Sequence, residues 1–165
     1  MSAECNNEIT PVRFRKIICS HFRDHARSFP WRETRDPFSI LVSEIMLQQT
    51  QVERVMLKYE QFIARFPSFS ALARADLQSV LKIWQGLGYN RRAVALRECS
   101  KRVIADHAGE LPRTAEELTQ LPGIGRATAG AILAFAYGIP TAFIETNIRR
   151  VFIHFFFPDR EDVRD

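Results

Sequence analysis

The 165-residue sequence predicts an all-α fold, on two observations. Apolar residues recur at intervals of three and four positions through most of the chain, which is the period of an amphipathic helix. No segment of the sequence alternates apolar and polar residues convincingly over the length of a strand. The composition also permits a folded core, because 46% of the residues are hydrophobic and 25% are charged.

Proline and glycine divide this pattern into about ten short helices. Asp76 is expected to cap one helix, and Thr114 with Glu117 has the spacing of a capping box. The expected helices lie at about 11–28, 38–49, 51–66, 69–74, 77–84 and 91–107, after Thr114, at 126–137, and from about 146 onward.

The net charge of +4 is concentrated in one region of the chain. Positions 82 to 102 contain six basic residues and a single acidic one, Glu98. The basic residues are Lys82, Arg91, Arg92, Arg97, Lys101 and Arg102. Such a stripe suits a surface that faces phosphates, and it equally suits a solvated helix face.

The three cysteines, Cys5, Cys19 and Cys99, are scattered and lack metal-ligand spacing, so we expect neither disulfides nor a zinc site. Residues 1–8 are polar and do not have the apolar segment of a signal peptide. No apolar run approaches the length that spans a membrane. We therefore expect an intracellular, cytoplasmic protein with no membrane partner.

The most informative motif is Leu-Pro-Gly-Ile-Gly at positions 121–125, between two predicted helices. Gly123 and Gly125 permit positive φ angles and close approach by another backbone, while Leu121 would anchor the turn in the core. The next helix presents unpaired N–H groups and its positive dipole end, and Arg126 adds a charge. We interpret the segment as a hairpin that binds a DNA phosphate; a purely structural turn is the alternative.

A second glycine loop at positions 86–89 precedes the long helix. Its Leu87 and Tyr89 are of the kind that wedge between base pairs and kink a duplex. The alternative is a capping glycine with both side chains buried, and the residues by themselves favour that alternative.

Two carboxylates suggest chemistry. Glu44 lies among apolar residues at helical spacing, where a carboxyl group keeps its proton more readily, as a general acid requires. A glutamate at the rim of the stripe that reaches solvent is the alternative. Glu145 precedes the last helix, where the helix dipole favours an acid in any case. As a pair, one would protonate a leaving group and the other would stabilise an oxocarbenium-like sugar.

Five segments together resemble the helix-hairpin-helix base-excision DNA glycosylases, and among them the adenine glycosylase (MutY) branch. They are Pro30-Trp31-Arg32, residues 43–52 with Glu-Ile-Met-Leu-Gln-Gln-Thr at 44–50, residues 84–89, residues 121–133 and residues 145–151. The resemblance implies a six-helix barrel at 31–138 that contains the helix-hairpin-helix motif. It also implies part of a second helical domain, formed by residues 1–30 with 139–165.

The resemblance implies that the protein flips a mispaired base out of double-stranded DNA. Glu44 would protonate the departing adenine, and Glu145 would stand at the position of the family's catalytic aspartate. Trp31 and Arg32 would line the base pocket. The opposite gap, where 8-oxoguanine would lie, would be probed by Gln49, Thr50, Leu87 and Tyr89, and the backbone would be held by Leu121, Gly123, Gly125 and Arg126.

Three departures from the family pattern change these expectations. Ala127 replaces the lysine that forms a Schiff base in bifunctional relatives, so we expect hydrolysis without lyase activity. Glu145 is one methylene longer than the aspartate it replaces, a shift of about an ångström that can cost about 10²-fold in rate. The sequence ends at Asp165 without cluster-spaced cysteines, so we expect no iron–sulfur cluster. The apolar stretch at 151–157 would then lack cover, as expected of a dimer, a poorly soluble chain or a fragment.

The expected function is a monofunctional DNA glycosylase that acts at the nucleoid and removes adenine opposite 8-oxoguanine or guanine. A thymine or uracil mismatch glycosylase is the alternative with the same chemistry. A catalytically inactive DNA-binding protein is the alternative from another functional class.

Overall fold

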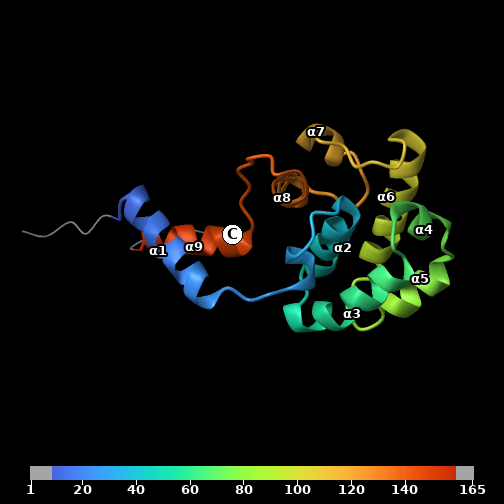
Figure 1. Cartoon of the computed structure of the whole chain (residues 1–165), viewed down its shortest axis with the longest axis horizontal. Coiled ribbons are helices and arrows are strands. Elements are labelled where there is room, and N and C mark those ends of the chain that lie inside the picture. Colours follow the sequence, from blue (N-terminus) through green and yellow to red (C-terminus); the bar gives the residue numbers. More distant parts are fainter. Residues whose placement is uncertain (1–8, 159–165) are drawn as a thin grey trace, which may run out of the picture. The chain divides into compact units, whose positions relative to one another are not determined.

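The computed structural model describes residues 9–158 and confirms the all-α prediction. Cys5, the polar N-terminal residues 1–8 and the end of the expected second domain at 159–165 lie outside the described residues. Within them the chain forms helices and no strand (Figure 1). The elements are α1 (Pro11–His25), the 3₁₀ helix η1 (Pro30–Arg32), α2 (Pro37–Leu47), α3 (Val52–Arg65), α4 (Phe69–Arg74), α5 (Leu77–Trp84), α6 (Arg91–Asp106), α7 (Ala115–Leu118), α8 (Arg126–Tyr137) and α9 (Thr146–Phe156).

Side-chain caps define several of these helix boundaries. Asp76 Oδ1 accepts a hydrogen bond of 2.8 Å from the Ser79 amide, which confirms the predicted cap of α5. Thr114 Oγ1 accepts from the Glu117 amide at 3.3 Å, and its hydroxyl donates to Glu117 Oε2 at 2.6 Å. The α7 cap therefore uses the predicted pair of residues.

The chain divides into two compact units, described here separately. The larger unit, Phe29–Phe143, has a continuous hydrophobic core. Helix α2 lies at its centre and packs against α3, α6 and α8, while α4 packs against α6 (Figure 1). The largest side chains in this core with essentially no exposure include Trp84, Phe62, Ile40, Leu41, Ile45 and Met46. Burial of this kind is the main favourable term in folding.

The smaller unit comprises Met1–Ser28 and Ile144–Asp165, of which the structure describes α1 and α9 with their flanking residues. The Phe14 ring of α1 lies 5.0–5.3 Å, centroid to centroid, from three rings of α9, those of Phe152, Phe155 and Phe156. None of the described residues of this unit is buried. The rings of Phe14, Phe155 and Phe156 are half-buried, and that of Phe152 is exposed.

No described helix is both long and apolar enough to cross a membrane.

Candidate active site and DNA-binding surface

Glu44 lies in the middle of the most enclosed helix of the molecule. Its neighbours Ser43 and Ile45 are buried, as are most other residues of α2, whereas Glu44 itself is half-buried. The predicted position at the edge of an apolar stripe is therefore confirmed. A carboxyl group in such surroundings remains within reach of a substrate while being partly removed from water.

Glu145 caps helix α9. Its Oε1 accepts a 2.7 Å hydrogen bond from the Ile148 amide, and its Oε2 accepts one of 3.2 Å from the Asn147 side chain. The structural role expected of an acid at a helix N-terminus is thus present. Glu44 and Glu145 belong to different units of the chain.

Trp31 and Arg32, expected to line a base pocket, lie in η1. The Trp31 side chain is only 8% exposed; it stacks on Phe29 at 5.1 Å and meets the Tyr59 ring edge-to-face at 5.2 Å. Arg32 is exposed, with its guanidinium 5.0 Å from the centroid of the Phe29 ring. In this conformation Trp31 is part of the aromatic core, and Arg32 is the accessible member of the pair.

The hairpin at 121–125 has most of the predicted geometry. Leu121 and Ile124 are buried and anchor the turn. Gly123 has φ +81°, and a Cβ there would lie 3.1 Å from that of Ala95, so both reasons for a glycine apply. Gly125 does not use the positive φ that glycine permits, because it is the extended N-cap of α8 with φ −91°.

The surface around the hairpin is open. Gly125 and Arg126 are exposed, and no heavy atom lies within 4 Å of a Cβ built on Gly125. The first amides of α8 have no acceptor four residues earlier within the helix, so they are available to an anion. Leu121 does not lie on this surface, because its side chain is buried in the core beneath the hairpin.

The turn after α2 contacts the hairpin. Gln48 donates from its side-chain amide to the Gly123 carbonyl at 3.4 Å and to the Thr128 hydroxyl at 3.3 Å. Gln49, which follows, is exposed and has φ +54°. The Thr50 hydroxyl is 3.4 Å from the Leu87 carbonyl oxygen, which joins this turn to the second glycine loop.

The second glycine loop corrects one prediction. Leu87 is not a wedge at the loop tip, because its side chain is 3% exposed and belongs to the core. Tyr89 is the residue that projects, with 55% of its surface exposed and φ +46°. Of the two expected probes in this loop, only Tyr89 is available to DNA in this conformation.

Arg92 is the residue that the sequence interpretation missed. It is 7% exposed. Its guanidinium donates to backbone carbonyls within residues 45–48 and to the Thr50 hydroxyl on one side, and to the Leu87 and Gly88 carbonyls on the other. Its burial lowers the pKa of the guanidinium, and Arg91 lowers it further, whereas Tyr89 raises it. Position 92 continues the buried stripe formed by Leu96, Cys99 and Val103, and this spacing was the available sign.

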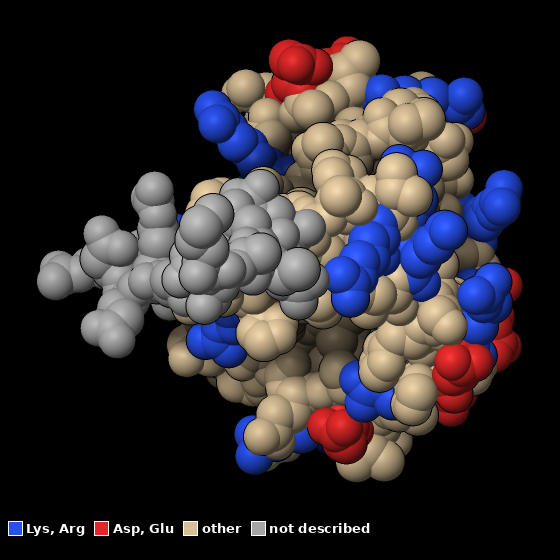
Figure 2. All heavy atoms as spheres, turned by 90° about the vertical axis from the view of Figure 1, so that its left-hand side faces the viewer, with Lys and Arg blue, Asp and Glu red and all other residues tan. Residues whose placement is uncertain are grey.

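The basic stripe is therefore not a continuous phosphate-facing surface. Arg92 is buried. Arg97 donates to the Ala75 carbonyl and forms an ion pair with Glu98, and Lys101 forms an ion pair with the same glutamate. Arg102 pairs with Asp106 and donates to a hairpin-side carbonyl, that of Gln120. In the view of Figure 2, Lys and Arg side chains lie scattered among uncharged ones, and Asp and Glu form smaller groups.

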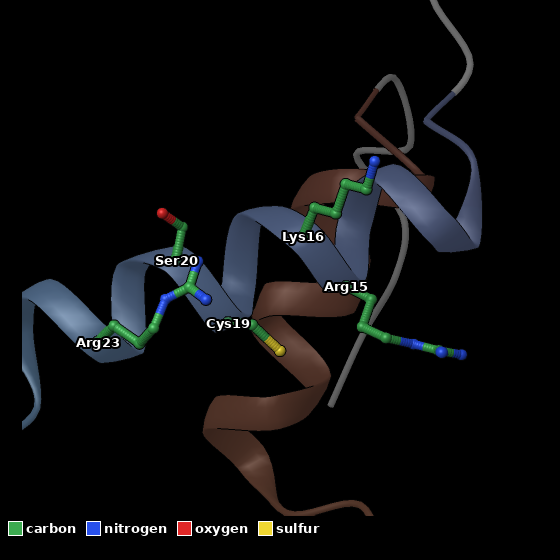
Figure 3. A pocket seen from close by; sticks show the side chains of 5 residues that line it. All are labelled: Arg15, Lys16, Cys19, Ser20 and Arg23. Atoms are coloured by element: carbon green, nitrogen blue, oxygen red, sulfur yellow. The ribbon is translucent and has the colours of Figure 1, made fainter.

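A separate basic hollow of about 470 Å³ lies on α1 in the smaller unit. Among the described residues, the side chains that line it come from this one helix (Figure 3): Arg15, Lys16, Cys19, Ser20 and Arg23. Cys19 is exposed, whereas burial raises the pKa of the Cys99 thiol to about 12. Over residues 9–158, no three potential metal ligands among His, Cys, Asp and Glu converge.

Comparison with known proteins agrees with the motifs in this geometry. The profile of the HhH-GPD superfamily base excision DNA repair protein matches residues 42–165. The adenine DNA glycosylase of Buchnera aphidicola subsp. Baizongia pistaciae is 38% identical over 149 residues, covering 90% of this chain and 42% of that protein. That of Mycobacterium tuberculosis (strain H37Rv) is 45% identical over 136 residues, covering 82% and 44%. The human enzyme is 40% identical over 147 residues, covering 84% and 27%.

Solved structures show the same fold. A thermostable thymine-DNA glycosylase superposes with a TM-score of 0.78 at 32% identity, over 86% of this chain and 67% of that one. An endonuclease III in a non-covalent complex with DNA gives 0.75 at 22% identity, over 87% and 68%, which supports the fold alone. This chain spans less than half the length of the curated relatives just described. It belongs to the HhH-GPD superfamily of base excision DNA repair proteins.

Proposed function

We propose that this chain is a monofunctional DNA glycosylase that removes adenine from a mispair with 8-oxoguanine or guanine in double-stranded DNA. The main support is the half-buried Glu44 on α2, within a chain 38–45% identical to proteins named adenine DNA glycosylase. The exposed hairpin at 121–125, next to the N-terminus of α8, supports binding of the DNA backbone.

In the proposed reaction, the flipped adenine leaves its deoxyribose as the C–N glycosidic bond breaks. Glu44 transfers its proton to the departing base, which leaves as neutral adenine. A water oxygen bonds to C1′ and passes its proton to the Glu44 carboxylate, so the products are free adenine, an abasic site and the restored acid. The carboxylate of Glu145 stabilises the oxocarbenium-like sugar between these events.

Ala127 supports hydrolysis without a lyase step. It is the second residue of α8, directly after the hairpin, and has no amine that could attack C1′. The abasic strand would therefore stay intact until alkali breaks it.

A thymine or uracil mismatch glycosylase is the second candidate. It is supported by the 32% identity and the TM-score of 0.78 to the thermostable thymine-DNA glycosylase. Both candidates use the same acid, and they differ in the base that enters the pocket.

Labelled duplexes that contain A opposite 8-oxoguanine, T opposite G, or U opposite G separate these candidates. The proposal expects alkali-labile sites at adenine in the first duplex, with Glu44→Gln as the inactive control. Cleavage of the second or third duplex instead favours the second candidate. If alkali breaks none of the three, the chain is a DNA-binding protein without this activity.

A further inference from the structure

Arg92 contacts two separate loops at once. Its Nη1 donates to the carbonyls of Ile45 and Met46, at 2.9 Å each, and to that of Gln48. Its Nη2 donates to the Thr50 hydroxyl at 2.8 Å and to the carbonyls of Leu87 and Gly88 at 3.0 and 3.2 Å. One planar group thereby joins the end of α2, the turn at 48–50 and the loop at 86–89.

The acceptors explain how a buried charge is tolerated at this point. The Ile45 and Met46 carbonyls belong to the last turn of α2, where acceptors have no partner within the helix and the dipole is negative. The guanidinium carbon also lies 5.6 Å from the Trp84 ring centroid and 5.5 Å from that of Tyr89. Arg92 Nε is buried without a hydrogen-bond partner, so the group is oriented to serve its Nη contacts.

Both segments contain a residue in the left-handed region of φ. Gln49 has φ +54° and Tyr89 has φ +46°; among described non-glycine residues only Ala108 shares this feature. Such conformations are unfavourable and persist where surrounding contacts fix them. Arg92 contacts residues 48 and 50 on either side of Gln49, and the two carbonyls that precede Tyr89.

We propose that Arg92 is a positioning residue that holds exposed Gln49 and Tyr89 as one rigid probe of the duplex, and so sets discrimination of the base opposite the target. The inference rests on the proposed glycosylase function. To donate to both loops at once, the side chain needs several N–H groups on one planar frame, as arginine has. Lysine has a single ammonium group and cannot contact both loops in the same way.

The test measures single-turnover adenine release from two duplexes that differ only in the opposite base, 8-oxoguanine or guanine. For Arg92→Lys, the ratio of the two rates should fall by about tenfold, within the discrimination that one well-placed base contact supplies. Arg97→Lys is the matched control, because Arg97 also lies on α6 and donates to a loop carbonyl, that of Ala75 at 2.7 Å. Its ratio should equal that of the wild type.

A purely structural role for Arg92 predicts a different outcome. Loss of folded protein lowers both rates by the same factor, so an unchanged ratio in Arg92→Lys overturns the proposal. If this variant does not fold, Arg92→Gln replaces it, because glutamine keeps one donor group and loses the planar fork that joins the two loops. Arg92→Gln should lower the ratio as well. An unchanged ratio in this variant also overturns the proposal.

A readout without catalysis separates this proposal from the proposed function. A 2-aminopurine placed next to the opposite base becomes more fluorescent when the duplex is unstacked. Wild type should raise its fluorescence on binding, and Arg92→Lys should do so less, as should Gln49→Ala. If wild type releases no base but shows this pattern, the glycosylase proposal fails while the positioning role stands. If Arg92→Lys matches wild type in fluorescence, the positioning role fails.

Discussion

The two units of this chain are built in opposite ways. Phe29–Phe143 encloses a hydrophobic core, a buried thiol and a carboxylate, Glu44, in the middle of a buried helix. The described part of the smaller unit buries no residue, exposes its cysteine, and has its carboxylate, Glu145, at the tip of a helix.

The comparison teaches how one residue type can serve two purposes. Glu44 has a partly dry environment, which suits a group that must hold and then release a proton. Glu145 accepts two hydrogen bonds, which fix the direction of the carboxylate that the proposed mechanism places beside a developing positive charge. The proposed roles of Glu44 as the acid and of Glu145 as the charge that stabilises the sugar therefore follow from the surroundings of each carboxylate within its own unit.

The largest effect is expected at Glu44. Replacing it by glutamine removes the proton and keeps the shape, so single-turnover adenine release should slow by about 10³-fold. Binding of the same duplex, followed by fluorescence anisotropy, should not weaken. A variant that retains the wild-type rate would show that Glu44 is a structural residue at the rim of α2.

A smaller effect is expected at Glu145, where two substitutions separate the cap from the charge. Asparagine and aspartate both cap helices well, but only aspartate keeps the negative charge. The Glu145→Asn variant should release adenine about 10²-fold more slowly than Glu145→Asp, as expected for loss of an electrostatic contact to the transition state.

Circular dichroism supplies the control for this pair, because both variants should have the same helix content. Equal rates in the two variants would mean that Glu145 acts only as the cap of α9, and that the comparison between the two carboxylates is wrong.

The same substitution in both units tests their difference in packing. Phe62 is fully buried, so Phe62→Ala should cost about 3–5 kcal/mol of unfolding free energy. Phe14 is partly exposed and contacts three rings, so Phe14→Ala should cost about 1 kcal/mol. Urea unfolding followed by circular dichroism measures both values. Equal costs would show that the smaller unit is as well packed as the larger one.

Much of the fold follows from sequence patterns because those patterns are local. The bounds of α4, α5 and α8 agree with the periodicity, and the Asp76 cap was identified from residue type alone. Helix α1 ends three residues earlier than expected, at His25, since residues 26–28 leave the helix before Pro30. The half-buried position of Glu44 among apolar neighbours was likewise predictable from spacing.

The candidate site was less predictable because its geometry depends on contacts between distant segments. The spacing of the buried stripe on α6 distinguishes Arg92 from Arg91. It does not show that the Arg92 guanidinium reaches acceptors more than forty positions away, in residues 45–50. The loop pattern by itself favoured burial of both Leu87 and Tyr89, whereas the resemblance implied that both probe DNA; the structure buries Leu87 and exposes Tyr89. The positive φ of Gln49 depends on those same long-range contacts and has no signal in its residue type.

Product analysis of one duplex, with A opposite 8-oxoguanine, tests the central claim of hydrolysis by this chain most directly. The reaction is run with borohydride present, which reduces any Schiff base to a permanent protein–DNA adduct. We predict free adenine, a strand that breaks only after alkali, and no adduct, because Ala127 offers no amine. A borohydride-trapped adduct, or a duplex that keeps its adenine, would contradict this account.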